Sequence, residues 1–180
     1  YDRSVLTNQG KQLTGDTLFY DRNTGVGEVF SRMVMTDTIN RNMLTGEYGY
    51  YNEQTDYAFA TDSAVAIDYS QGDSLFLHAD SMFREMRAFH KVRFYRTDVQ
   101  GTADSLVFST VDSCLTMYRD PIIWNKNQQL LGEVIKVYMN DSTIDWSHII
   151  GQALSVERVD STIYNQVTGK EMKSYFTNGE

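Results

Sequence analysis

The sequence predicts an all-β protein, and three observations lead to this prediction. The chain of 180 residues contains 12 Tyr and 9 Phe but a single Pro, and aromatic side chains fit a pleated sheet better than a helix face. Apolar and polar residues alternate along many short segments, which is the period of a β-strand. These segments recur at regular intervals, as they do in repeat proteins. We therefore expect residues 1–180 to form a single β-repeat domain.

Six segments share an acidic residue followed by a short alternating run, and they recur about every 29 residues. They are "LTGDTLFYD" (13–21), "LTGEYGYYN" (44–52), "QGDSLFLHA" (71–79), "TADSLVFST" (102–110), "LGEVIKVYM" (131–139) and "RVDSTIYNQ" (158–166). Their acids are Asp16, Glu47, Asp73, Asp104, Glu133 and Asp160. Each unit offers one acid, so we expect these acids to accept hydrogen bonds from backbone N–H groups at turns or strand edges.

An apolar segment precedes each acid, so one unit is expected to be a strand, a polar turn and a second strand. The second and fourth positions after the acid are more apolar than the first and third. This alternation predicts that the second and fourth positions face the interior and that the first and third face water. The inward positions include Leu18 and Tyr20, Leu75 and Leu77, Leu106 and Phe108, and Ile135 and Val137.

Turn residues separate these strands. The segment "YDRNTGVGEV" (20–29) predicts a hairpin, because Asn and Gly tolerate positive φ angles, and similar turns are expected at 52–55, 125–127 and 140–142. Pro121 suits the start or the edge of a strand. Residues 81–91 fit either a helix or a strand. Residues 144–157 also fit both periods, and Gly151 favours a strand there.

Composition and charge exclude some functions. The net charge is −8, and no cluster of Lys and Arg could neutralise a nucleic acid backbone. Cys114 is the only cysteine and is expected to be a small core residue. The three histidines are scattered, so we expect neither a metal site nor a cofactor. The chain contains no run of 18 apolar residues. It starts at Tyr1 without Met or an apolar leader, as expected of a mature form or an excised segment.

One short motif points towards catalysis. Gly72-Asp73-Ser74-Leu75 matches the nucleophile motif of GDSL esterases, and the D-x-x-H pattern ending at His148 could complete a triad. Such hydrolases place the serine on a strand-to-helix turn, whereas residues 75–80 continue a strand pattern. In our alignment of the repeats, Thr17 and Ser105 occupy the position of Ser74. We therefore expect Ser74 to be an ordinary strand residue and the protein not to be an enzyme, with the esterase as a remote alternative.

Two longer stretches carry a family resemblance. The segments "GDTLFYDRNTGVGEVFSRMVMTD" (15–37) and "ADSLVFSTVDSCLTMYRDPIIW" (103–124) resemble the OstA-like family of lipopolysaccharide-transport proteins. The family pattern is acid-x-apolar-x-Tyr, a turn with Gly, and then small-Gly-x-Val. Gly27-Glu28-Val29 and the variant His90-Lys91-Val92 match the final part of this pattern, Gly-x-Val. The resemblance extends from about Val5 to about Tyr164.

The resemblance implies a β-jellyroll of stacked V-shaped rungs with an apolar groove and no catalytic centre. It implies a periplasmic protein that shields the acyl chains of lipopolysaccharide or a related glycolipid. Partners would be other OstA-like proteins, or further copies of the chain, joined through terminal edge strands. The alternative is a β-repeat scaffold of the cell envelope whose inward residues only pack together. The groove candidates are Leu18, Tyr20, Met33, Met35, Leu75, Leu77, Val92, Phe94, Leu106, Phe108, Ile135 and Val137.

Overall fold

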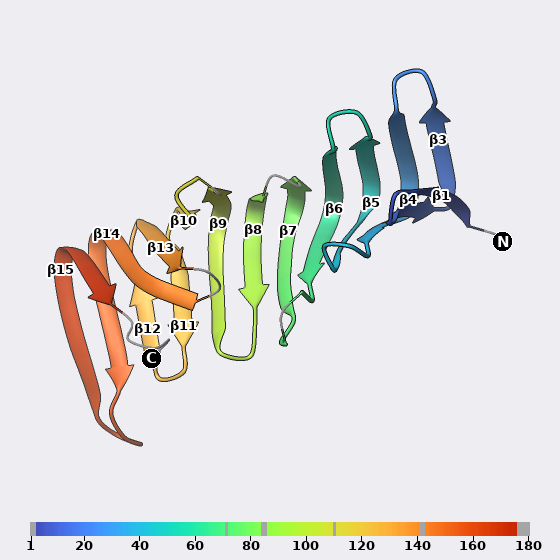
Figure 1. Cartoon of the computed structure of the whole chain (residues 1–180). Coiled ribbons are helices and arrows are strands. Elements are labelled where there is room, and N and C mark those ends of the chain that lie inside the picture. Colours follow the sequence, from blue (N-terminus) through green and yellow to red (C-terminus); the bar gives the residue numbers. More distant parts are fainter. Residues whose placement is uncertain (1–2, 71, 84–85, 110, 141–142, 176–180) are drawn as a thin grey trace. The chain divides into compact units, whose positions relative to one another are not determined.

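A computed structural model describes residues 3–70, 72–83, 86–109, 111–140 and 143–175. Every regular element in these ranges is a β-strand (Figure 1), so the predicted all-β fold of stacked antiparallel strands is confirmed. The chain divides into two compact units, residues 1–90 and 91–180, which are described separately. The prediction of a single domain stays a prediction.

The first unit is an antiparallel sheet of strands that follow one another in the chain. The pairing order is β1-β2-β4-β5-β6-β7, and β3 pairs with β4. β8 (Arg87–Tyr95) crosses the boundary between the two units. The strands of the first unit are β1 (Ser4–Asn8), β2 (Lys11–Gly15), β3 (Thr17–Asp21), β4 (Val26–Asp37), β5 (Asn42–Asn52), β6 (Tyr57–Asp68) and β7 (Leu75–Phe83).

The second unit is also antiparallel, and two of its strands each pair with two different neighbours on one side. β9 pairs with β11 through residues 99–102 and with β10 through residues 105–109. β14 likewise pairs with β13 and then with β12, while β15 pairs with β14. The strands are β9 (Val99–Ser109), β10 (Cys114–Tyr118), β11 (Ile122–Asn125), β12 (Gln128–Leu131), β13 (Val134–Asn140), β14 (Thr143–Arg158) and β15 (Tyr164–Tyr175).

A two-residue break interrupts the long strands near their middle. The pairing skips residues 31–32 of β4, 62–63 of β6 and 151–152 of β14. All six residues have positive φ angles, which is uncommon for residues other than glycine. Such an irregularity bends a strand. Each bent strand therefore contributes to two arms of its unit, as expected of V-shaped rungs.

We call the two arms of the first unit arm A and arm B. Arm A contains β1, β2 and residues 33–37, 42–45, 64–68 and 75–79 of β4 to β7. Arm B contains β3 and residues 26–30, 48–52, 57–61 and 81–83 of the same four strands.

A small residue followed by an acid marks the break on alternate strands. These pairs are Gly15-Asp16, Gly46-Glu47, Ala79-Asp80, Ala103-Asp104 and Gly132-Glu133. The small residue is needed because there is no space for a larger one. A Cβ atom on Gly15 would lie 2.1 Å from Cγ1 of Val29, and one on Gly132 would lie 2.5 Å from Cγ2 of Ile149.

Two of the six acids, Asp73 and Asp160, do not lie at a break. In the third repeat the acid at the break is Asp80, not Asp73, which lies before the start of β7. Asp160 lies in the turn between β14 and β15, where its carboxylate accepts hydrogen bonds from the N–H groups of Thr162 and Ile163. Both acids accept hydrogen bonds from backbone N–H groups, as expected from the sequence, because Asp is favoured at turns.

The acids at the breaks bind the neighbouring strand, but Asp16 and Asp104 do so through arginine side chains, and only Glu47 accepts from a backbone N–H group as predicted. Asp16 accepts hydrogen bonds of 3.0 Å and 2.6 Å from the guanidinium of Arg32, and this contact lowers the pKa of Asp16. Glu47 accepts a 3.4 Å hydrogen bond from the backbone N–H of Arg32. In the second unit Asp104 pairs with Arg119 at 3.0 Å. The acids thus stabilise residues held at unusual backbone angles.

The remaining local predictions are largely confirmed. A hairpin joins β3 and β4, and residues 144–157 belong to the single strand β14. Residues 81–91 belong to β7 and β8 rather than to a helix, although 84–85 lie outside the described residues. The turns at 52–55 and 125–127 lie between strands, whereas 141–142 are not described. Pro121 directly precedes β11, and Cys114 is buried in β10.

Candidate functional site

Apolar residues form continuous rows on one face of each arm of the first unit. Residues that pair directly across antiparallel strands lie on the same face of the sheet. In arm A one such row contains Leu6, Leu13, Met35, Leu44, Ala66 and Leu77. In arm B the corresponding row contains Leu18, Val29, Gly49, Ala60 and Met82. All of these residues are buried or half-buried.

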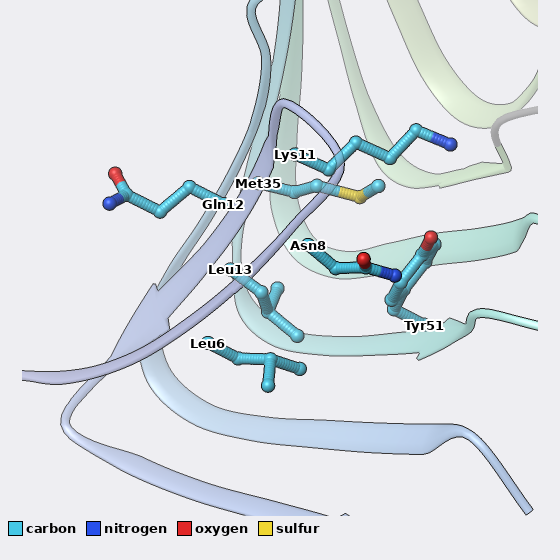
Figure 2. Close-up of a pocket in the computed structure, with 7 residues that line it drawn as sticks. All are labelled: Leu6, Asn8, Lys11, Gln12, Leu13, Met35 and Tyr51. Carbon is cyan, nitrogen blue, oxygen red and sulfur yellow. The ribbon is translucent and has the colours of Figure 1, made fainter.

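The two rows face each other across the interior of the unit. Leu6, Leu13 and Met35 of arm A line a pocket together with Tyr51 of arm B. Figure 2 shows the three aliphatic side chains pointing towards the strand that carries Tyr51, whereas Gln12 points away. The pocket volume is about 10 Å³, which is roughly the space of one water molecule. The side chains that line this pocket are therefore closely packed.

Close packing continues towards the breaks. Met33 of β4 rests on Gly49 of β5, where a Cβ atom would lie 2.5 Å from Cγ of Met33. Leu13 reaches the backbone at Gly27, with its Cδ2 atom 3.3 Å from the position of an added Cβ. Both contacts join arm A to arm B. The glycines of arm B thus accommodate the long side chains of arm A.

A polar cleft lies beside the apolar pocket, between the turns that end the two arms. Its volume is about 420 Å³, and its lining includes Lys11, Asp37, Tyr51, Glu53 and Asp56. Lys11 of arm A forms an ion pair with Asp56 of the turn between β5 and β6. The ammonium nitrogen of Lys11 also lies 5.8 Å from the centroid of the Tyr51 ring.

The carboxylates of this cleft have structural partners. Asp37 is 1% exposed and accepts hydrogen bonds from the backbone N–H groups of Ile39 and Asn40 at 3.1 Å and 2.9 Å. Glu53 accepts a 2.6 Å hydrogen bond from the hydroxyl of Tyr20, which raises the pKa of that tyrosine. The cleft is therefore built from turns that are fixed by their own hydrogen bonds.

The second unit has comparable apolar rows on both sides of its breaks. One row contains Leu106, Met117, Ile135, Ile149 and Met172, and the next contains Phe108, Leu115, Val137, Ser147 and Ser174. On the other side of the breaks, a row of Gly101, Ile123, Leu130 and Ser155 ends at Val167 in β15. Val167 is 56% exposed, so this row is open at its last strand.

The sequence-predicted groove residues divide into two groups by burial. Met33, Met35, Val92, Phe94, Leu106, Ile135 and Val137 are buried, whereas Leu18, Tyr20, Leu75, Leu77 and Phe108 are half-buried. Leu75 lies at the outer end of arm A, in a row whose other members are Lys11, Asp37, Asn42 and Asp68. That these residues line a lipid groove stays a prediction.

Sequence reasoning missed the outer face of arm B, which we call the aromatic face. It consists of Phe19, Phe30, Tyr48, Tyr50, Tyr57, Phe59 and Phe83 of arm B, together with Phe89 of the neighbouring strand β8. Their rings form an unbroken series of contacts with centroids 5.1–6.3 Å apart. The first and third positions after the acid were expected to face water, and Phe19, at the third position after Asp16, is indeed 61% exposed. The signal was present as consecutive aromatic residues, such as "YGYYN" at 48–52.

The residues of the proposed esterase triad have ordinary structural positions. Ser74 is not a strand residue, because it precedes β7, and its N–H donates to Asp73 at 2.9 Å. Ser81, which follows Asp80 at the break, is the true counterpart of Thr17 and Ser105. No strand-to-helix turn follows Ser74, since β7 begins at the next residue. The ring nitrogen Nε2 of His148 lies 2.7 Å from the carboxylate of Glu171.

Within the described ranges, no group of three or more His, Cys, Asp or Glu side chains could hold a metal ion. In the same ranges no helix is long and apolar enough to cross a membrane.

The comparisons with known proteins find likeness among solved structures only. No family model matches the sequence, and no curated protein matches it. Among solved structures the chain is similar to the crystal structure of LptH from Pseudomonas aeruginosa, described as the LptA-homologous periplasmic component of the lipopolysaccharide transport device. The TM-score is 0.41 at 10% identity, covering 88% of this chain and 94% of that chain. This likeness assigns no ligand or partner to the chain.

Proposed function

We propose that the protein is a periplasmic component of lipopolysaccharide transport that shelters glycolipid acyl chains between its arms. The observation that carries the proposal is the continuous apolar row on the inner face of each arm, from Leu6 to Leu77 and from Leu18 to Met82. The OstA-like pattern of the sequence supports the same function. No catalytic step is part of it.

The physical reason for a carrier is the cost of exposing acyl chains to water. Each CH₂ group contributes about 0.8 kcal/mol, so a twelve-carbon chain costs about 10 kcal/mol to expose. A trough lined with apolar side chains removes most of this cost, because the hydrophobic effect does not depend on direction. Methionines such as Met33 and Met35 suit this task, since their flexible side chains adapt to ligands of irregular shape.

Strand edges provide the means of joining partners. Among the described strands, β1 pairs with β2 alone and β15 pairs with β14 alone, so each has a second edge to offer. An unpaired edge can accept a strand from another chain. We propose that OstA-like partners, or further copies of this chain, add at these edges and extend the apolar rows.

A scaffold without lipid is the second candidate, and the close packing of the first unit favours it. The pocket of about 10 Å³ beside Tyr51 leaves no space for an acyl chain unless the arms separate. If the arms stay together, the inner rows serve only as a core. The two functions differ in whether a lipid reaches the inner rows.

Photocrosslinking from matched positions tests the proposal. A photoreactive amino acid is placed at Leu77 or Phe108, whose side chains belong to inner rows, and at their neighbours Phe76 or Val107 on the opposite face. The cells make lipopolysaccharide, and crosslinked glycolipid is detected by immunoblotting.

If the protein is a lipid carrier, glycolipid should label Leu77 and Phe108 several-fold more than Phe76 and Val107. Equal labelling on both faces, or none on either, contradicts the carrier. No labelling in a protein that still crosslinks to other envelope proteins supports the scaffold.

A further inference from the structure

An ion pair joins the two arms of the first unit at the end away from the breaks. Lys11 begins β2 in arm A, and Asp56 ends the turn that connects the arm B segments of β5 and β6. Their side chains are in direct contact, although 45 residues separate them in the chain. We call Lys11 and Asp56 the clasp.

Both members of the clasp are held in place by their surroundings. The side chain of Asn52 accepts hydrogen bonds from the N–H groups of Gln54 and Thr55 at 2.9 Å and 3.2 Å, which fixes the turn that presents Asp56. The hydroxyl of Tyr51 lies 3.5 Å from Asp56, and the Tyr51 ring lies beneath the ammonium group of Lys11. A cation near an aromatic face gains further electrostatic stabilisation.

The clasp lies directly above the apolar interior. Lys11 and Tyr51 line both the polar cleft of about 420 Å³ and the apolar pocket of about 10 Å³. A ligand that enters from this end therefore passes the clasp before it meets Leu6, Leu13 and Met35. The small apolar pocket cannot admit an acyl chain while arm A and arm B remain in contact.

We propose that the clasp is a gate: it holds the arms of the first unit closed, and an acyl chain enters when the Lys11–Asp56 pair opens. The part of this inference that concerns lipid rests on the proposed function. The part that concerns the arms stands on the geometry alone.

The exposure of the two side chains sets the strength of this gate. The side chain of Lys11 is 21% exposed and that of Asp56 is 48% exposed, so water and salt weaken their attraction. Partly exposed ion pairs shift an equilibrium by up to about fivefold. The gate is therefore weak enough for a ligand to open it without a source of energy.

The distance between the arms can be measured without any ligand. Spin labels are attached to cysteines replacing Thr7 of β1 and Thr55 of the opposing turn, which are both exposed, in a Cys114→Ala background. Lys11→Met removes the charge and keeps an unbranched apolar stem against Tyr51. We expect Lys11→Met and Asp56→Asn to lengthen and broaden the distance distribution measured by pulsed electron resonance.

Two variants serve as controls for this measurement. Lys136→Met removes a lysine from β13 in the other unit and should leave the distribution unchanged. The exchanged pair Lys11→Asp with Asp56→Lys keeps opposite charges at the same positions and should restore the short distance. An unchanged distribution in both single variants overturns the gate.

Uptake of a fluorescent long-chain fatty acid, cis-parinaric acid, then tests the link to lipid. Stopped-flow fluorescence should show entry up to about fivefold faster in Lys11→Met than in the unmodified protein, with Lys136→Met unchanged. Equal entry rates in a variant whose arms have separated overturn the gate. If the arms separate but no variant binds the probe, the proposed lipid function fails while the closure of the arms by the clasp stands.

Discussion

At the scale of single residues, the breaks depend on small side chains more than on charge. Gly15, Gly46 and Gly132 lie where the chain crosses closely over a neighbouring strand, and Ala79 and Ala103 take the same place in the remaining repeats. The acid that follows then binds the neighbouring strand from outside, as Asp16 does with Arg32. A repeat is therefore recognised by the small residue and the acid together.

Replacing the glycine of one break tests this account. In Gly15→Ala the new Cβ atom would lie 2.1 Å from Cγ1 of Val29 and 3.1 Å from the backbone oxygen of Ser31, so the strands must move apart. We expect the free energy of unfolding to fall by about 1–3 kcal/mol, as overpacking usually costs. Chemical denaturation followed by circular dichroism measures this change.

Gly72 provides a matched control for this substitution. It belongs to the similar motif "GDSL", yet an added Cβ atom would have no neighbour within 4 Å. Gly72→Ala should change the free energy of unfolding by less than about 0.5 kcal/mol. Equal losses in the two variants would contradict the assignment of Gly15 to a break and Gly72 to a loop.

At the scale of elements, the period of the sequence predicted most strands but not every register. The alternation around Leu106 and Ile135 identified the buried face correctly, because one set of positions is more apolar than the other. The third repeat was misaligned because "GDSL" and "HADS" both contain a small residue followed by Asp and Ser. Only the strand pairing shows which of the two segments lies at the break. Register depends on contacts between strands, which a single-sequence pattern does not contain.

The candidate site, like the strands, could be predicted only in part from the sequence. The apolar inner rows follow from the period of the strands, whereas the clasp has no local signal. Lys11 begins β2 directly after the turn at Gly10, and Asp56 ends the turn before β6. Either residue alone is typical of an exposed loop. Their pairing depends on the bend of β4 and β5, which brings the ends of the two arms together.

The aromatic face leads to a prediction about the stability of arm B. The ring of Phe59 lies within 5.5–6.1 Å of the rings of Tyr48, Tyr50, Tyr57 and Phe83. Each aromatic pair across strands contributes about 0.2–1 kcal/mol. Phe59→Ala should therefore lower the free energy of unfolding by about 1–3 kcal/mol, although Phe59 lies outside the core.

Phe76 is the appropriate comparison for Phe59. It also lies on an outer face, that of arm A, and is 41% exposed. Phe76→Ala should cost less than about 0.5 kcal/mol, as surface substitutions usually do. Urea denaturation of both variants measures the two losses in the free energy of unfolding. Equal small effects would mean that the rings of the aromatic face do not stabilise one another.

At the scale of the whole molecule, the two units share one plan but differ at their terminal strands. The inner rows of the first unit begin at β1 in arm A and at β3 in arm B, and the clasp joins the two arms. In the second unit an apolar row ends at Val167 on β15, whose side chains are mostly exposed on both faces. The open row and the unpaired edge lie on the same strand, so a strand that adds to β15 would also cover Val167.

This coincidence predicts that association of the chain depends on β15. We expect the protein to form oligomers as its concentration rises, because strand addition at β15 buries Val167 and pairs backbone groups along the edge. Val167→Lys places a charge in the last position of the apolar row and should weaken association by at least tenfold. Sedimentation velocity over a range of concentrations measures the change.

Val111→Lys is the matched control, because Val111 is 91% exposed in the turn between β9 and β10, away from the edge. Association that is unchanged in Val167→Lys, or reduced equally by Val111→Lys, would show that copies of the chain do not join through β15.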